Sequence, residues 1–531
     1  MNALKFAPGL LAALLLMSGF AQAHEGEAKG QLGRVSFANS CNAAVQPLLQ
    51  TGVAMLHSFW YRASEDTFRK VLAQDPSCTI AHWGIAAILM QNPLAGTGAN
   101  AKQAALAQAA IDEGRRVPPK TQRERDYIEA VAAYYRDFST RSERSRQESR
   151  AKAFEELAAR YPDDDEAQIF SALYIAGTQS QADQTYAAYL RAAAILEKMF
   201  VKYPEHPGVA HYLIHSYDAP PIAKQGLSAA RRYASIAPDA PHALHMPSHI
   251  FTRVGLWEES IATNLRSAAV AKKAGDGLEA YHASDYSVYA YLQLARDREA
   301  KQEMEEALRV TDSNPTAIAG AYSSAAMPAR YAIERGAWQE AMQLQPRPSN
   351  FPFTVAITHF ARALGAARSG DAAAAEKDAA ELERLHKTLV AANNTYWATE
   401  VEVQRLTVAG WIAHAQGRRD DALKFMRAAA DLEDKTEKHI VKPGRIVPAR
   451  ELLGEMLLEL KQPAAAVKEF EASHVREPNR FRGYYGAARA ADAAGDRRKA
   501  AEYYAKLMEL GKKGDSSRPE LVRARQYVAQ R

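Results

Sequence analysis

Histidines are concentrated in one part of this chain. Of the 15 histidines in 531 residues, six lie between positions 206 and 249, where an even distribution would place about one. Four of them form two pairs, His211 with His215 and His245 with His249, and both pairs have a spacing of four residues. On a helix this spacing puts both rings of a pair on one face. Paired imidazoles of this kind are common partial sites for zinc, copper or nickel.

Carboxylates lie near both histidine pairs. Asp218 follows the first pair, and His282 and Asp285 lie further along the chain, so that either carboxylate could complete or orient a metal site. A metal site would use His211, His215, His245 and His249 as ligands. The alternative is that these histidines, which stand among tyrosines, form partly buried hydrogen bonds or line a polar groove for a peptide. A hydrolytic metal centre is disfavoured, because the sequence contains no HExxH motif. The predicted ligand-binding groove comprises His211, His215, Tyr217, Asp218, His242, His245, His249, Arg253, His282 and Asp285.

The elements that must position these side chains are helical repeats. A glycine followed five residues later by alanine or serine recurs along the chain, and Gly336 and Gly370 are separated by 34 residues, which is the tetratricopeptide period. The small residue lets two antiparallel helices cross closely, and the glycine forms the turn between them. Alternating β-branched runs typical of strands are essentially absent. The glycine and small-residue pairs are Gly255 with Ser260, Gly336 with Ala341, Gly370 with Ala375, Gly417 with Ala422, and Gly495 with Ala500.

The rest of the repeat pattern resembles the tetratricopeptide family. It is seen in Gly52, Met55, Phe68, Val71 and Pro76, and again in Ala466, Phe470, Ser473 and Pro478. The phrases AHYLIHSYDAP, HMPSHIFTRVGLW and PNRFRGYYGAARAA are similar to a bacterial exported branch of that family, to which no settled activity is attached. The resemblance implies an all-α fold, a right-handed superhelix of helical hairpins, in which the first helices line the concave face. In that register His242, His245 and His249 take places that face the groove.

Composition and the amino terminus restrict the location and the partners. Residues 1–23 combine Lys5, an apolar run and a small-residue end, which is typical of a cleaved signal peptide and predicts a periplasmic or secreted protein. The 67 Lys and Arg against 62 Asp and Glu form no long basic block, which argues against nucleic acid. No later stretch approaches the roughly 20 apolar residues that span a membrane.

Cys41 and Cys78 are expected to form a disulfide, the alternative being two separate buried thiols.

The predicted organisation is a signal peptide at 1–23, a flexible mature terminus at 24–38, and three repeat blocks at 39–180, 181–345 and 346–531, the second carrying the histidines. The acidic and histidine residues between 433 and 439 are expected to form a solvated helix end. The leading functional hypothesis is an exported scaffold that binds a protein segment or small ligand in its concave groove. The alternative is a periplasmic protein that binds copper, zinc or nickel through the cluster between His211 and His249. An enzyme is the third possibility, although no complete catalytic motif is present.

Overall fold

A computed structural model describes residues 31–117, 119–309, 317–515 and 517–530. Within these residues every regular element is a helix and there is no strand, so the predicted all-α fold is confirmed. The residues from Gln31 onward form one compact unit. The predicted signal peptide at 1–23 lies outside the described residues, and the predicted block boundaries stay a prediction.

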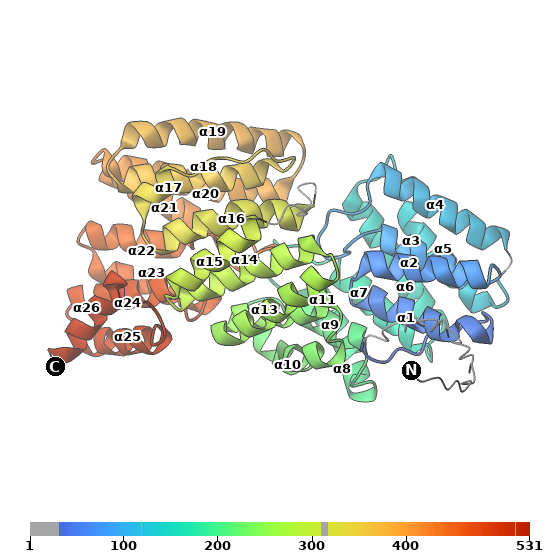
Figure 1. Cartoon of the computed structure of the whole chain (residues 1–531). Helices are drawn as coiled ribbons and strands as arrows, with labels where there is room; N and C mark the ends of the chain where they lie inside the picture. The colour runs from blue at the N-terminus through green and yellow to red at the C-terminus, as the bar shows by residue number, and fades with distance from the viewer. Residues whose placement is uncertain (1–30, 118, 310–316, 516, 531) are drawn as a thin grey trace, which may run out of the picture. The chain divides into compact units, whose positions relative to one another are not determined.

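Each helix packs on the next and several also on the next but one, and most consecutive helices form antiparallel hairpins (Figure 1). The first are η1 (Ala43–Val45), α1 (Gln46–His57), α2 (Tyr61–Gln74), α3 (Ile80–Leu89), α4 (Ala101–Arg116), α5 (Gln122–Tyr135), α6 (Glu143–Arg160), α7 (Asp165–Ala176) and α8 (Ala187–Lys202). Then come α9 (Pro207–Ser216), η2 (Ala223–Gly226), α10 (Leu227–Ile236), α11 (Pro241–His245), α12 (Pro247–Val254), α13 (Trp257–Lys273), α14 (Gly277–Gln293), α15 (Asp297–Leu308), α16 (Ile318–Glu334) and α17 (Trp338–Met342). The last are α18 (Pro352–Arg368), α19 (Ala372–Ala391), α20 (Thr395–Ala415), α21 (Arg419–Glu433), α22 (Ala449–Glu459), α23 (Pro463–Arg476), α24 (Phe481–Ala493), α25 (Arg497–Leu510) and α26 (Pro519–Ala529).

The predicted turn glycines occupy the turns between helices. All five have a positive φ, a backbone conformation that glycine adopts at little cost, and a new helix begins two residues after each. The small residue five positions after each glycine is completely buried in every case, as the close crossing of two helices requires. The glycine spacing therefore identified the hairpins correctly. The buried small residues are Ser260, Ala341, Ala375, Ala422 and Ala500.

The recurring place of the aromatic residue in the repeat pattern has a packing reason. Phe68 of α2 is fully buried, and a Cβ added to Gly52 of α1 or to Gly84 of α3 would lie against its ring. Phe470 of α23 has the same relation to α22 and α24. The ring thus fills the space that three consecutive helices leave where small residues face one another.

The amino-terminal segment departs from expectation. Residues 31–38 belong to the stretch expected to be flexible, but Leu32 and Phe37 are buried, and the Phe37 ring stacks on Trp83 with centroids 5.0 Å apart. Burial of a large aromatic ring holds this part of the chain against α3, which corrects that expectation. Cys41 and Cys78 form a disulfide.

None of the described helices is long and apolar enough to cross a membrane.

Candidate metal centre

Four helices bring six histidines together. His211 and His215 lie on α9, His242 and His245 on α11, His249 on α12 and His282 on α14. Helices α11 and α12 form one interrupted helix: α11 ends at His245, and Pro247 starts α12 as its first residue, where its missing N–H costs nothing. Met246 between the two helices keeps helical backbone angles, φ −52° and ψ −38°, so His245 and His249 remain on one face. All six histidine side chains are buried or nearly so.

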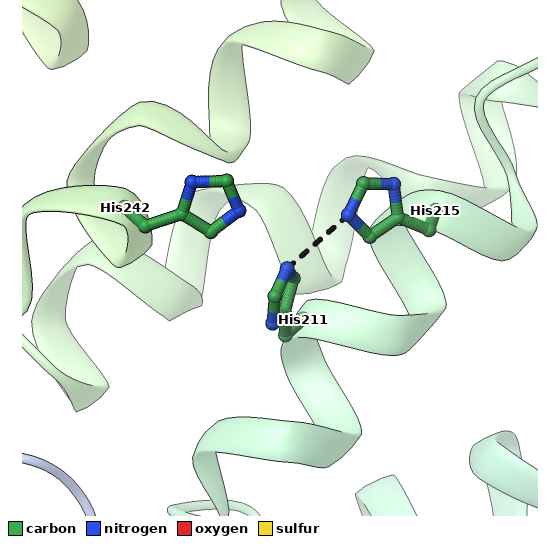
Figure 2. A group of neighbouring side chains, drawn as sticks. All are labelled: His211, His215 and His242. Atoms are coloured by element: carbon green, nitrogen blue, oxygen red, sulfur yellow. Dashed lines mark hydrogen bonds between the residues drawn. The ribbon is translucent and has the colours of Figure 1, made fainter. Parts of the chain in front are cut away.

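Three of these rings, His211, His215 and His242, form what we call the first triad (Figure 2). One nitrogen from each ring lies within 4.8 Å of the others, and the Nε2 atoms of His211 and His215 are 3.2 Å apart. Figure 2 shows the three rings arranged around a common space, each with a nitrogen directed into it. The sequence had paired the first two, and the structure adds His242.

The outer nitrogens of the first triad are held by hydrogen-bond acceptors. His211 Nδ1 lies 2.6 Å from the carbonyl oxygen of His57, and His242 Nδ1 lies 3.1 and 3.2 Å from the two carboxylate oxygens of Glu279. Because a carbonyl and a carboxylate only accept, both Nδ1 atoms carry the hydrogen and both Nε2 atoms carry a lone pair. His242 Nε2 is buried and has no hydrogen-bond partner in the described part of the chain.

The second triad consists of His245, His249 and His282, again with one nitrogen of each ring within 4.8 Å of the others. His245 Nε2 and His249 Nε2 are 3.2 Å apart. The rings of His245 and His282 are in contact, with centroids 4.6 Å apart. The four histidines predicted as ligands of one site are therefore divided between two neighbouring triads, each completed by a third ring.

The tautomers of His245 and His249 are determined by their outer contacts. His245 Nδ1 lies 2.7 Å from Asn264 Oδ1, and Asn264 Nδ2 donates to the carbonyl oxygen of Ser260 at 2.7 Å, which fixes the orientation of the amide. His249 Nδ1 lies 2.9 Å from the carboxylate of Asp218. Both rings therefore carry their hydrogen on Nδ1 and direct a lone pair at each other. Two facing lone pairs repel, and the Tyr286 hydroxyl, 3.4 Å from His249 Nε2, lies closer to the carbonyl oxygens of Ile440 and Lys442. A cation between the two rings would make this arrangement favourable.

A proton is a poor candidate for that cation. Burial lowers the pKa of His245 to about 4, although the Glu279 carboxylate acts in the opposite direction. Burial lowers the pKa of His249 to about 3 as well, although the Asp218 carboxylate acts in the opposite direction. Burial first and neighbouring histidines second also hold the pKa values of His211, His215 and His282 well below the usual value. At neutral pH these rings are neutral and available as metal ligands.

Asp218 connects the second triad to two cationic side chains. Besides His249, its carboxylate accepts from Arg253 Nε at 2.7 Å and from Lys438 Nζ at 3.1 Å. Burial alone would raise the pKa of Asp218, but Lys438, Arg253 and His249 together hold that pKa well below its usual range. Glu279 behaves in the same way: burial opposes ionisation, and His242 keeps the pKa of the carboxyl low. Each triad thus has one ionised carboxylate behind one of its rings.

A third histidine group shows what a purely structural arrangement looks like. His57 Nε2 and His206 Nε2 lie 2.9 and 3.0 Å from the two oxygens of Glu166. His57 Nδ1 lies 2.9 Å from the Tyr212 hydroxyl, which can donate to it, and His206 Nδ1 accepts the backbone N–H of Val209. Every ring nitrogen has a partner of the right kind, and no cation is required. In the two triads, by contrast, Nε2 atoms of neighbouring imidazoles face each other.

The other predicted groove residues have different roles. Arg253 positions Asp218 and so belongs to the outer layer of the second triad. The Tyr217 hydroxyl donates to Glu197 at 2.7 Å, toward α8. Asp285 pairs with Arg330 of α16 instead of with an imidazole. Burial raises the pKa of Asp285 to about 6, against the effect of Arg330.

Three residues of this centre were not predicted from the sequence. Glu279 lies three residues before His282 on α14, a spacing that could have suggested it. Asn264 had no signal, and Lys438 stands in the stretch expected to be solvated. That expectation is wrong for Glu437 and His439, because residues 436–447 are all buried. The charges of this segment are compensated inside the protein, Lys438 by Asp218 and Glu437 by Arg253.

No protein-family model matches the chain, and a search among curated proteins finds no relative. Among solved structures, the human IFIT1 dimer with PPP-AAAA is 13% identical, with a TM-score of 0.39 over 81% of this chain and 90% of that chain. The APC/C hetero-tetramer Cut9-Hcn1 is 11% identical, with a TM-score of 0.30 over 90% of this chain and 95% of that chain. Both TM-scores are below 0.5, so the fold is defined here by the helical hairpins themselves.

Proposed function

We propose that this protein binds a divalent transition metal ion, copper or zinc, through the second triad. The observation that carries the proposal is the contact between His245 Nε2 and His249 Nε2, two buried lone-pair nitrogens 3.2 Å apart. In zinc sites the Zn–N bond is about 2.0 to 2.1 Å, so two nitrogens on one tetrahedral ion lie about 3.3 Å apart. The spacing of the two rings therefore suits a shared ion.

The donor set indicates the class of metal. Three neutral imidazoles suit zinc, copper or nickel, whereas calcium and magnesium prefer oxygen ligands. The outer contacts of His245 and His249 with Asn264 and Asp218 are of the kind that orient metal-binding histidines and strengthen them as ligands. Three protein ligands leave one position of a tetrahedral ion open for water or another small ligand.

Binding of a protein segment at the same patch is less well supported. Residues 436–447 are buried, and Lys438 of that segment pairs with Asp218 beside the second triad. The side chains of His211, His245 and His249 are at most 2% exposed. A peptide could reach these rings only by displacing the segment. The helical hairpins stay a plausible scaffold for partners elsewhere on their surface.

The proposed location is the periplasm or the exterior of the cell. The pattern of residues 1–23 supports export, and the disulfide between Cys41 and Cys78 supports an oxidising compartment. Amino-terminal sequencing of the protein recovered from the periplasm should begin at His24. A mature protein that still carries residues 1–23 would contradict export by a cleaved signal.

The metal proposal is tested on protein purified without a histidine tag. We expect at least one equivalent of zinc or copper by elemental analysis after loading and desalting, and loss of at least one equivalent in the double variant His245→Gln, His249→Gln. The matched control is His386→Gln with His414→Gln, two partly exposed histidines outside the triads. Less than about 0.1 equivalent in the loaded wild-type protein would refute the proposal, because a preformed three-imidazole site should retain its metal.

A further inference from the structure

The first triad repeats the arrangement of the second. We propose that His211, His215 and His242 bind a second ion of the same class, so that the protein carries a centre of two neighbouring ions. This inference rests on the proposed function for the class of metal, and its own support is the geometry of the first triad.

The inner nitrogens of the first triad lack satisfactory partners without an ion. His211 Nε2 and His215 Nε2 are 3.2 Å apart, the same separation as in the second triad. His215 could donate an Nε2 hydrogen to His211, but His242 Nε2 would then stay buried and unpartnered within the described residues. Leaving such a nitrogen unpaired in the interior is unfavourable, because it has lost its hydrogen bonds to water. An ion in the space between the three rings would use the Nε2 lone pairs of all three (Figure 2).

The outer layer of the first triad is also built as a metal site requires. The carbonyl of His57 and the carboxylate of Glu279 place the hydrogens of His211 and His242 on Nδ1, away from the common space. Glu279 provides the first triad with an ionised carboxylate, as Asp218 does for the second. A buried dication needs such compensating charge nearby.

Six rings divided in this way fit two ions better than one. The ligand nitrogens of a single bound ion lie within about 4 Å of one another, because each metal–nitrogen bond is about 2 Å long, and nitrogens within 4.8 Å of one another reach that spacing by small ring movements. The close nitrogen groups are found inside each triad, while the triads meet through ring contacts such as His215 with His249, whose centroids are 5.4 Å apart. An ion bound to Nε2 lies about 3 Å from its ring centroid, so these two ions would be at most about 12 Å apart. Two cupric ions at such a distance interact magnetically.

The experiment counts ions in the full mature protein with either triad disabled. Four proteins are loaded with copper(II) or zinc and then desalted. They are the wild type, the first-triad variant His211→Gln with His215→Gln, the second-triad variant His245→Gln with His249→Gln, and the variant with all four changes. We expect two equivalents of metal in the wild type, one in each double variant and none in the variant with all four changes. The control His386→Gln with His414→Gln should bind two equivalents. In the electron paramagnetic resonance spectrum, each one-copper variant should show an isolated copper signal that accounts for all its copper. The two-copper wild type should show a broadened or diminished signal.

The possible failures are distinguishable. One equivalent in wild type that only the second-triad variant loses would overturn the second ion and leave the proposed function intact. One equivalent lost in both variants would show a single shared ion, with the same consequence. No bound metal in wild type would overturn the proposed function itself.

Circular dichroism checks the fold of each variant. If a double variant unfolds, Glu279→Gln supplies the second measurement: it removes the charged acceptor of His242 Nδ1 and should weaken the first ion more than the second, because Glu279 has a hydrogen bond to His242 but reaches His245 and His282 only through its charge.

Discussion

Replacing Asn264 with leucine tests the tautomer argument for the second triad. Asn264 is fully buried on α13, and its Oδ1 is the atom that holds the hydrogen of His245 on Nδ1. Leucine has a similar volume but no acceptor. In the variant, the His245 hydrogen can move to Nε2 and be donated to His249 Nε2, 3.2 Å away. The metal-free protein then has a favourable hydrogen bond in place of two facing lone pairs.

The expected loss of binding free energy equals the cost of one buried, unpaired N–H group. To bind an ion through Nε2, His245 must return its hydrogen to Nδ1, which now faces an apolar side chain. An unsatisfied buried donor costs about 1 to 3 kcal/mol. At about 1.4 kcal/mol for each tenfold change, the affinity of the second triad should fall by about 5- to 140-fold.

Competition with a chelator of known zinc affinity measures this loss. Asn264→Asp keeps an acceptor in the same place and adds negative charge, so its affinity should equal or exceed that of wild type. Asn394→Leu, at the start of α20 and remote from the triads, is the matched control and should bind as wild type does. A folded Asn264→Leu protein with wild-type affinity would show that the position of the His245 hydrogen does not govern binding.

Three further predictions concern stability. Burial lowers the pKa of His439 to about 4 in the folded protein, whereas its pKa in the unfolded chain is about 6.5. As the pH falls, the unfolded state therefore takes up a proton first, and the free energy of unfolding decreases between about pH 6.5 and pH 4. When the pH is lowered from 7.5 to 5.0, the free energy of unfolding measured in urea should decrease by about 2 kcal/mol less in the metal-free His439→Gln variant than in the metal-free wild type. An equal decrease in both proteins would contradict this prediction. The variant Cys41→Ala with Cys78→Ala removes a disulfide that joins residues 37 positions apart, and the free energy of unfolding should fall by about 4 kcal/mol in the same assay. A fall of less than about 1 kcal/mol would show that this loop is already ordered in the unfolded chain. Gly486→Ala places a Cβ against the ring of Phe470 and should cost about 1 to 3 kcal/mol, whereas no change in the unfolding midpoint would mean that the ring can move aside.

Local spacing was enough to predict the hairpins. The turn glycines adopt positive φ and the small residues after them are buried, because both requirements arise within a few residues of the same turn. For the same reason, the four-residue spacing correctly placed His211 with His215, and His245 with His249, on shared faces.

The partners of these pairs were decided by the tertiary structure. His242 joins His211 and His215 although it is nearer in sequence to His245, because the packing of α9, α11, α12 and α14 decides which rings meet. The burial of residues 436–447 depends on charges such as Asp218 and Arg253, which lie about 200 positions away in sequence. The sequence by itself determined the helices and the faces of the histidine pairs. Only the packing of distant helices decided that six imidazoles form two triads, since contacts between helices depend on crossing geometry that no local spacing records.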